Sequence, residues 1–232
     1  MSRTADPTIK IALLRASEAV FAEKGLPAAK VEEITRRAGT SKGAFYLHFA
    51  SKEEAFKHVV EAFLARCSSM LPEPEALPHA ETLAGWLDEW LRIDEDMYEF
   101  LWANRAIVAI LLGCQGDHVY LLEAFNKEIH ARTVGWIAYW KEQGLFRKDL
   151  DEQLAATLVG GAHHQLCRTM IESHAKPPIA LWLQNVQSIF GRGFGTPSLV
   201  KAIDESENAP VSQPVQRGNS GAVRRRGKAA AR

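Results

Sequence analysis

Apolar residues recur at helical spacing along nearly the whole chain as far as residue 194. They fall at positions i, i+3, i+4 and i+7, which places them on one face of an α-helix. No segment shows the alternation of apolar and polar residues that is typical of a half-buried strand. With 232 residues, the chain is long enough to bury one or two sizeable cores. We therefore expect an all-α fold.

Turn and capping residues divide this pattern into separate helices. The first helix is expected to begin at Asp6-Pro7, because an acceptor followed by proline is typical of a helix start, and to end at Gly25. A capping box formed by Ser51 and Glu54 opens a long helix that is expected to end near Met70. Further helices are expected at about 79–97, 99–113, 117–143, 151–174 and 179–194.

Residues 31–54, with the sequence VEEITRRAGTSKGAFYLHFASKEE, contain a more specific pattern. Two short amphipathic segments, Val31 to Ala38 and Lys42 to His48, are joined by the tight turn Gly39-Thr40-Ser41. This is the spacing of a helix-turn-helix, in which a short turn directs a second helix into the major groove of DNA. The segment therefore indicates a DNA-binding regulator.

The distribution of charge agrees with DNA binding at one end of the chain. The formal net charge is zero, but it is +3 over residues 1–58 (the head), −6 over residues 59–203 (the body) and +3 over residues 204–232 (the tail). A basic head on an acidic body suits DNA contact through the head alone. The tail is rich in Ser, Pro, Gly, Ala and Arg and is expected to be disordered.

Cysteine usage and hydropathy narrow the classes of protein to which this chain could belong. Cys67, Cys114 and Cys167 form no CxxC pair, so neither a disulfide framework nor a zinc site is indicated. No run reaches the ~18 apolar residues of a membrane span, and no signal peptide is evident. We expect a cytoplasmic protein without a membrane contact, and without a cofactor.

The N-terminal residues resemble the TetR family of bacterial one-component regulators. The resemblance covers roughly residues 8–60 and is specific, because many positions agree at fixed spacing. Residues 143–147 and 149–151 also resemble the family, in its usual link into the penultimate helix, but this match is weaker. The matching positions in the N-terminal part are Ala19 to Gly25, Val31 to Ile34, Arg37 to Gly39, Ser41 to Gly43, Tyr46, His48, Phe49 and Ser51 to Glu53.

This resemblance implies about nine helices, with a three-helix head and a fourth helix leading into a body that binds a small molecule and dimerises. The expected function is a repressor that binds an inverted-repeat operator in double-stranded DNA as a homodimer and is released by a small-molecule effector. A regulator whose body only dimerises remains an alternative. A helical enzyme is a weaker one, because no catalytic motif is present and acidic runs such as Asp94 to Asp96 are expected to be solvated helix ends.

The resemblance also assigns residues to the DNA contact. The main candidates are Lys42, Tyr46, His48 and Lys52, whose side chains suit phosphate and base contacts. Lys30 stands near the start of the second helix, where the family usually has a capping Thr or Ser, and is expected to contact phosphate instead. The start of the recognition helix is formed by Thr40, Ser41, Gly43 and Ala44.

Candidate effector and dimer residues come from the body. Apolar walls with a few polar groups describe a ligand pocket, but they equally describe a helical core. Arg105 would need a partner if it were buried among its apolar neighbours. His163 and Cys167 lie four residues apart and invite a metal hypothesis, but no second pair supports it. The effector candidates are Trp102, Arg105, Phe125, Trp136 and Trp140, and the dimer candidates are Gly160, His164, Cys167, Trp182, Val186 and Phe190.

Overall fold

The computed structural model describes residues 6–73, 82–112 and 119–208. Within these residues the fold is all-α, and the only β-type pairing is an isolated bridge between Phe146 and Gly195. The helices are α1 (Pro7–Ala28), α2 (Val31–Arg37), α3 (Lys42–His48), α4 (Lys52–Met70), α5 (Leu83–Ala103), α6 (Arg105–Leu112), α7 (Val119–Glu142), α8 (Glu152–Glu172), α9 (Ile179–Phe194) and α10 (Pro197–Glu207).

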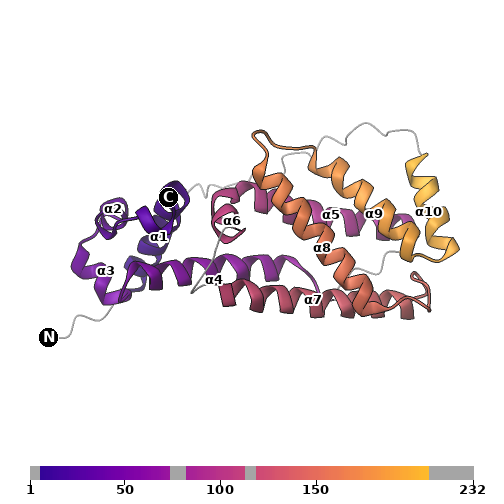
Figure 1. Cartoon of the computed structure of the whole chain (residues 1–232), viewed down its shortest axis with the longest axis horizontal. Coiled ribbons are helices and arrows are strands. Elements are labelled where there is room, and N and C mark those ends of the chain that lie inside the picture. Colours follow the sequence, from indigo (N-terminus) through magenta and orange to yellow (C-terminus); the bar gives the residue numbers. More distant parts are fainter. Residues whose placement is uncertain (1–5, 74–81, 113–118, 209–232) are drawn as a thin grey trace, which may run out of the picture.

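The molecule is elongated, with α1, α2 and α3 gathered at one end (Figure 1). Helix α4 leaves this end and packs along α7, which in turn packs against α8. Helices α5 and α9 pack together in the rest of the body, and α10 covers both of them. None of the described helices is long and apolar enough to cross a membrane.

The ends of the head helices follow from local side-chain chemistry. Asp6 caps α1 by accepting a hydrogen bond of 2.8 Å from the Thr8 N–H. Gly25 has φ 72°, so the regular part of α1 ends there, as predicted, although the helical assignment continues to Ala28. Helix α2 begins after Lys30, whose side chain makes no capping hydrogen bond. The missing Thr or Ser cap is therefore not replaced.

One apolar cluster joins the head to the body. Helix α4 contributes to it along most of its length, and α6 packs against α1 at the same place. The cluster crosses the expected domain boundary between residues 58 and 59. A shift of α4 or α6 would therefore change the packing of the head helices. Its most deeply buried large side chains are Leu13, Phe21, Ile34, Phe45, Phe49, Phe56 and Val60.

Two expectations about the body were wrong. A break was expected near residue 98, but α5 continues through the buried Tyr98 to Ala103 and is capped by Asn104. Helix α10 was not predicted, and it extends past residue 204, where the tail was expected to begin. It forms because Leu199 and Ile203 are buried against the body. Residues 209–232, to which most of the disorder prediction applies, lie outside the described residues.

Candidate DNA-binding surface and internal cavity

Helix α3 divides its side chains between the core and the outer surface. Phe45 and Phe49 are fully buried and fix the helix on the head. Tyr46 is 56% exposed, and the Lys42 side chain is exposed to the same extent. Leu47 is also exposed, at 55%, although it was not among the sequence candidates. Helix α3 therefore presents lysine, tyrosine and leucine side chains to a partner.

The turn before α3 sets the direction of the helix. Gly39 has φ 66°, a left-handed conformation that favours glycine. The Thr40 N–H donates to the Thr35 carbonyl at 2.9 Å, and the Ser41 hydroxyl accepts from the Ala44 N–H at 3.1 Å. Gly43 is exposed, and a Cβ there would make only ordinary contact with Ser41 at 3.7 Å. The head itself therefore does not require glycine at position 43.

Two of the candidate cations on this surface differ in their surroundings. Lys42 forms an ion pair with Glu32 on α2, and the hydrogen bond from Lys42 lowers the pKa of the Glu32 carboxyl. Lys30 is exposed at the start of α2. A phosphate bound by Lys42 would have to replace Glu32 as the partner of the ammonium. His48 is half-buried, with its ring centroid 6.3 Å from that of Phe49, so it covers part of the core.

Lys52, a candidate for phosphate contact, makes hydrogen bonds within the protein. Its ammonium donates to the carbonyl oxygens of Leu26 at 2.9 Å, Pro27 at 3.0 Å and Ala29 at 3.1 Å. These carbonyls lie where α1 ends, and a cation there is favourable because the carbonyl groups lack helical partners. The structure therefore gives Lys52 a role in joining α4 to the α1–α2 connection.

The body contains an apolar cavity of about 250 Å³. Residues from α4, α5, α6, α7, α8 and α9 form its wall, including Phe63, Leu64 and Cys67 of α4. Phe125, Trp136 and Trp140 line it, as expected for effector candidates. The cavity is thus bounded by the same helix that carries the head.

Trp102 and Arg105, the other two effector candidates, lie away from this cavity. Trp102 packs in a separate apolar cluster with Met170 and Leu183. Arg105 is exposed, and its guanidinium lies over the Trp102 ring at 4.8 Å from the ring centroid. Arg105 lies at the solvent-exposed start of α6. Because its guanidinium is not buried, it does not need the acidic or anionic partner that a buried arginine would require.

Three polar residues that were not among the effector candidates interrupt the apolar wall. The Tyr98 hydroxyl donates to the His163 carbonyl at 3.0 Å and lies 3.0 Å from His163 Nδ1. Asp94 lies one helical turn before Tyr98, and burial raises the pKa of both groups. Asp94 was expected to be solvated, and this was wrong. The signal available in the sequence was its position one turn after Trp90 on an otherwise apolar face.

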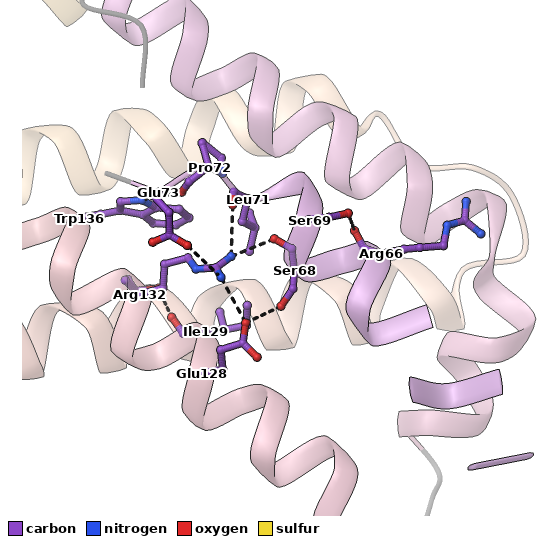
Figure 2. Close-up of polar contacts among 11 residues, drawn as sticks. Arg66, Ser68, Ser69, Leu71, Pro72, Glu73, Glu128, Ile129, Arg132 and Trp136 are labelled. Atoms are coloured by element: carbon purple, nitrogen blue, oxygen red, sulfur yellow. Dashed lines mark hydrogen bonds and ion pairs between the residues drawn. The ribbon is translucent and has the colours of Figure 1, made fainter. Parts of the chain in front are cut away.

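The C-terminal end of α4 is fastened to α7 by Arg132 (Figure 2). Its guanidinium donates to the Ser68 carbonyl at 2.9 Å and the Leu71 carbonyl at 3.2 Å. Glu128 at 3.2 Å and Glu73 at 3.3 Å complete its partners. One turn further on, the Trp136 indole donates to the Pro72 carbonyl at 3.1 Å. Trp136 therefore lines the cavity and also holds the chain that leaves α4.

The dimer candidates on α8 and α9 do not form one outward surface. Cys167 and Phe190 are half-buried, pack against the apolar clusters and line the cavity. Gly160 and His164 also border the cavity, but both are exposed. Trp182 packs into the same cluster as Trp102, and Val186 is half-buried. The outer faces instead carry exposed apolar side chains that the sequence analysis did not single out. They are Leu154 and Leu158 on α8 and Leu181 and Ile189 on α9.

The metal hypothesis finds no support in the arrangement of the ligand-type side chains. Among residues 6–73, 82–112 and 119–208, no three His, Cys, Asp or Glu residues come together as a metal site would require. His163 contacts Tyr98, and Cys167 is an apolar-packed thiol. Both residues form part of the cavity lining.

A helix-turn-helix head joined by a long helix to a hollow helical body defines a one-component DNA-binding regulator. Residues 13–59 match the model of the bacterial regulatory proteins of the tetR family. The transcriptional repressor KstR2 of Rhodococcus jostii (strain RHA1) is 30% identical over 152 residues, which are 62% of this chain and 70% of the relative. The chain belongs to the TetR family and is a DNA-binding transcriptional regulator.

Solved structures show the same fold. SmeT, the repressor of a multidrug efflux pump of Stenotrophomonas maltophilia, matches with a TM-score of 0.67 at 18% identity, over 82% of this chain and 92% of its own. KstR2 of Mycobacterium tuberculosis, a ketosteroid transcriptional regulator, matches with a TM-score of 0.55 at 25% identity, over 81% and 95%. These matches are to regulators and lend no support to the enzyme alternative.

Proposed function

We propose that this protein represses transcription from an inverted-repeat operator and is released from it when a small molecule fills the internal cavity. The proposal rests on the observation that α4 contacts the head at one end and lines the body cavity at the other. Its first turn contacts the end of α1, and Phe63, Leu64 and Cys67 near its other end form a wall of the cavity. Both KstR2 and SmeT are named as repressors.

The operator contact is assigned to the outer face of α3 and its flanks. Tyr46, Lys42 and Lys30 are exposed there and supply a phenol and two cations for phosphate and base contacts. Gly43 and Ala44 lie at the start of α3, where a small side chain permits close approach to the major groove. His48 contributes at the edge of the surface. Lys52 is assigned to positioning of the head.

Dimerisation is assigned to the outer faces of α8 and α9, which are consecutive antiparallel helices (Figure 1). Leu154 and Leu158 are four residues apart and share one face of α8, and Leu181 and Ile189 share one face of α9. Packing these faces against a second copy gives a four-helix arrangement. The two-fold symmetry presents two heads to half-sites about 34–36 Å apart.

Release requires that the effector bind more tightly to the form that does not fit the operator. Helix α4 offers a physical route for this difference, because its C-terminal end is held by Arg132 and Trp136 while its N-terminal end holds the head through Lys52. A ligand that displaces the cavity wall moves α4 against both attachments. The separation of the two heads then changes.

The test is selection of genomic DNA fragments by the purified full-length protein, followed by sequencing and a promoter-reporter assay. We expect an enriched inverted repeat that overlaps a promoter, and higher reporter output when the gene for this protein is deleted. The matched control is the Tyr46→Ala variant, which removes an exposed side chain and leaves the buried Phe45 in place. Enrichment without symmetry, or lower output on deletion, would contradict the proposal.

A further inference from the structure

Four tryptophans gather at one end of the cavity. Trp86 and Trp90 come from α5, and their ring centroids are 5.2 Å apart. Trp140 of α7 lies 5.1 Å from Trp86, 5.5 Å from Trp90 and 6.3 Å from Trp136. A recess of about 40 Å³ opens between these rings and shares Trp90, Trp136 and Trp140 with the main cavity.

Asp94 is the carboxylate of this tryptophan cluster. It lines both the main cavity and the recess, one turn after Trp90. Neither lining contains a lysine or an arginine among the described residues. Glu89, which borders the recess, is paired with Arg92 at 2.5 Å. Burial raises the pKa of the Asp94 carboxyl, and the nearby His163 and a hydrogen bond with Trp90 oppose this rise only in part.

Trp140 provides a second, independent sign of a ligand site. It is 7% exposed, and its indole N–H is buried without a hydrogen-bond acceptor among the described residues. Buried donors are normally paired, and an unpaired one calls for an explanation such as a missing ligand atom. An acceptor on the body of a ligand would satisfy the Trp140 donor, whereas an ammonium group has no lone pair with which to accept it.

A carboxyl group that shares a recess with four tryptophans favours a cationic ligand. The faces of tryptophan rings carry negative potential and attract cations, more strongly when water is excluded. An ammonium group also supplies a permanent opposite charge for Asp94, which the neighbouring His163 carries only when it is protonated. The remainder of the cavity wall is mostly apolar and suits a hydrocarbon body.

We propose that the cavity binds a hydrophobic organic cation, an amine or quaternary ammonium compound, whose charged group lies between Asp94 and the four tryptophans. The inference rests on the proposed function only in identifying this ligand with the effector. An anionic ligand such as a fatty acid would place its carboxylate against Asp94 with no lysine or arginine in the described lining to offset the repulsion. A neutral ligand would gain nothing from the charge of Asp94.

The experiment compares three probes that share one hydrocarbon chain and differ in the head group, namely octyltrimethylammonium, octanoate and octan-1-ol. Binding to the full-length protein is followed by titration calorimetry and by tryptophan fluorescence. We expect the ammonium compound to bind at least about tenfold more tightly than either of the others. Tightest binding by octanoate, equal binding of all three, or no saturable binding of the ammonium compound overturns the proposal.

Two variants on α5 test the role of Asp94. Asp94→Asn removes the charge at nearly constant volume and is expected to weaken ammonium binding about tenfold or more while leaving octan-1-ol unchanged. Asp96→Asn is the matched control, because Asp96 is exposed and pairs with Arg92. Equal ammonium binding by both variants overturns the assignment. If Asp94→Asn does not fold, the probe comparison on the unaltered chain decides.

Operator release is measured separately, so the two proposals fail in different ways. If the ammonium compound binds through Asp94 but leaves the operator complex intact, the ligand class stands and effector control through this cavity fails. If an anionic or neutral compound binds in the cavity and releases the operator while the ammonium compound does not bind, the proposed function stands and this inference is wrong.

Discussion

The ammonium of Lys52, in the first turn of α4, lies 2.9 Å from the carbonyl oxygen of Leu26, where α1 ends. The same group donates to the carbonyls of Pro27 and Ala29. All three N–H bonds of the ammonium are thereby directed to the protein, and none is left for a phosphate. Lys52 thus fixes the angle between α4 and the helices that face DNA.

The first prediction concerns Lys52→Met, which keeps an unbranched side chain one atom shorter and removes the three hydrogen bonds. We expect the free energy of unfolding to fall by about 1–2 kcal/mol, because carbonyls that were paired with a charged donor lose their partner. Operator affinity falls, but its dependence on salt stays the same, because no phosphate contact is lost. Denaturant titration and binding at several salt concentrations measure both effects. A shallower salt slope would instead place Lys52 on the DNA.

The second prediction concerns the Lys42–Glu32 pair. Lys42→Ala is expected to weaken binding to all DNA sequences and to reduce the salt slope by about one phosphate contact. Glu32→Gln is expected to act in the opposite direction and tighten binding by about two- to fivefold, because Lys42 no longer exchanges a carboxylate for a phosphate. Fluorescence anisotropy with a labelled operator measures both. Weaker binding by Glu32→Gln would show that Glu32 positions Lys42 for the DNA contact.

The head was predictable because its signals are local. The acceptor and proline at Asp6-Pro7, the glycine at Gly39 and the cap at Ser51 each act within a few residues, and the structure shows each of them in place. The carbonyl partners of Lys52 could not be predicted, for the complementary reason. Its partner carbonyls lie 23 to 26 residues earlier in the chain, and no local pattern indicates that the α1–α2 connection comes within reach.

The cavity was predictable only in part. Phe125, Trp136 and Trp140 line it, and their helical phase on α7 could be read from the sequence. Trp102 and Arg105 have a similar composition around them, but Trp102 lies on a face of α5 that packs with Met170 and Leu183, and Arg105 is exposed at the start of α6. The approach of α7 to α5, which surrounds Asp94 with indole rings, depends on tertiary packing and left no periodic signal.

The third prediction concerns Arg132, whose side chain is only 15% exposed and contacts two carbonyls and two carboxylates (Figure 2). Arg132→Met is expected to lower stability by roughly 2 kcal/mol, because the carbonyls at the end of α4 lose a charged donor. It should also weaken the effect of an effector on operator binding, because α4 is no longer held at that end. Arg132→Lys is the control, since lysine keeps the charge but lacks the planar fork that reaches several acceptors. Full effector response in Arg132→Met would exclude this attachment from the response.

The fourth prediction concerns the thiols of Cys67 and Cys167, which both line the cavity. Burial raises the pKa of each to about 11, so roughly one thiol in a thousand is ionised at pH 8. Alkylation by iodoacetamide should therefore be slow in the folded protein and slower still with a ligand in the cavity. Mass spectrometry of a Cys114→Ser variant measures it, and protein unfolded in guanidinium provides the fast reference. Folded protein that reacts as fast as the reference would show that both thiols reach solvent.

The last prediction concerns the exposed apolar faces of α8 and α9. Leu158 is 51% exposed and Ile189 is 67% exposed, and a single copy of the chain leaves both in water. If these faces pack against a second copy, Leu158→Glu or Ile189→Glu places an unpaired charge in an apolar interface, and the dimer should dissociate at micromolar concentration.

The matched control is Ile11→Glu on α1, where an isoleucine with 53% exposure lies outside the proposed interface. Analytical ultracentrifugation gives the mass, and circular dichroism checks that each variant is folded. A dimer that survives both substitutions, or an unaltered chain that is already monomeric, would place the two-fold contact elsewhere or remove it. The operator footprint then distinguishes these cases, because two heads protect two half-sites and a single head protects one.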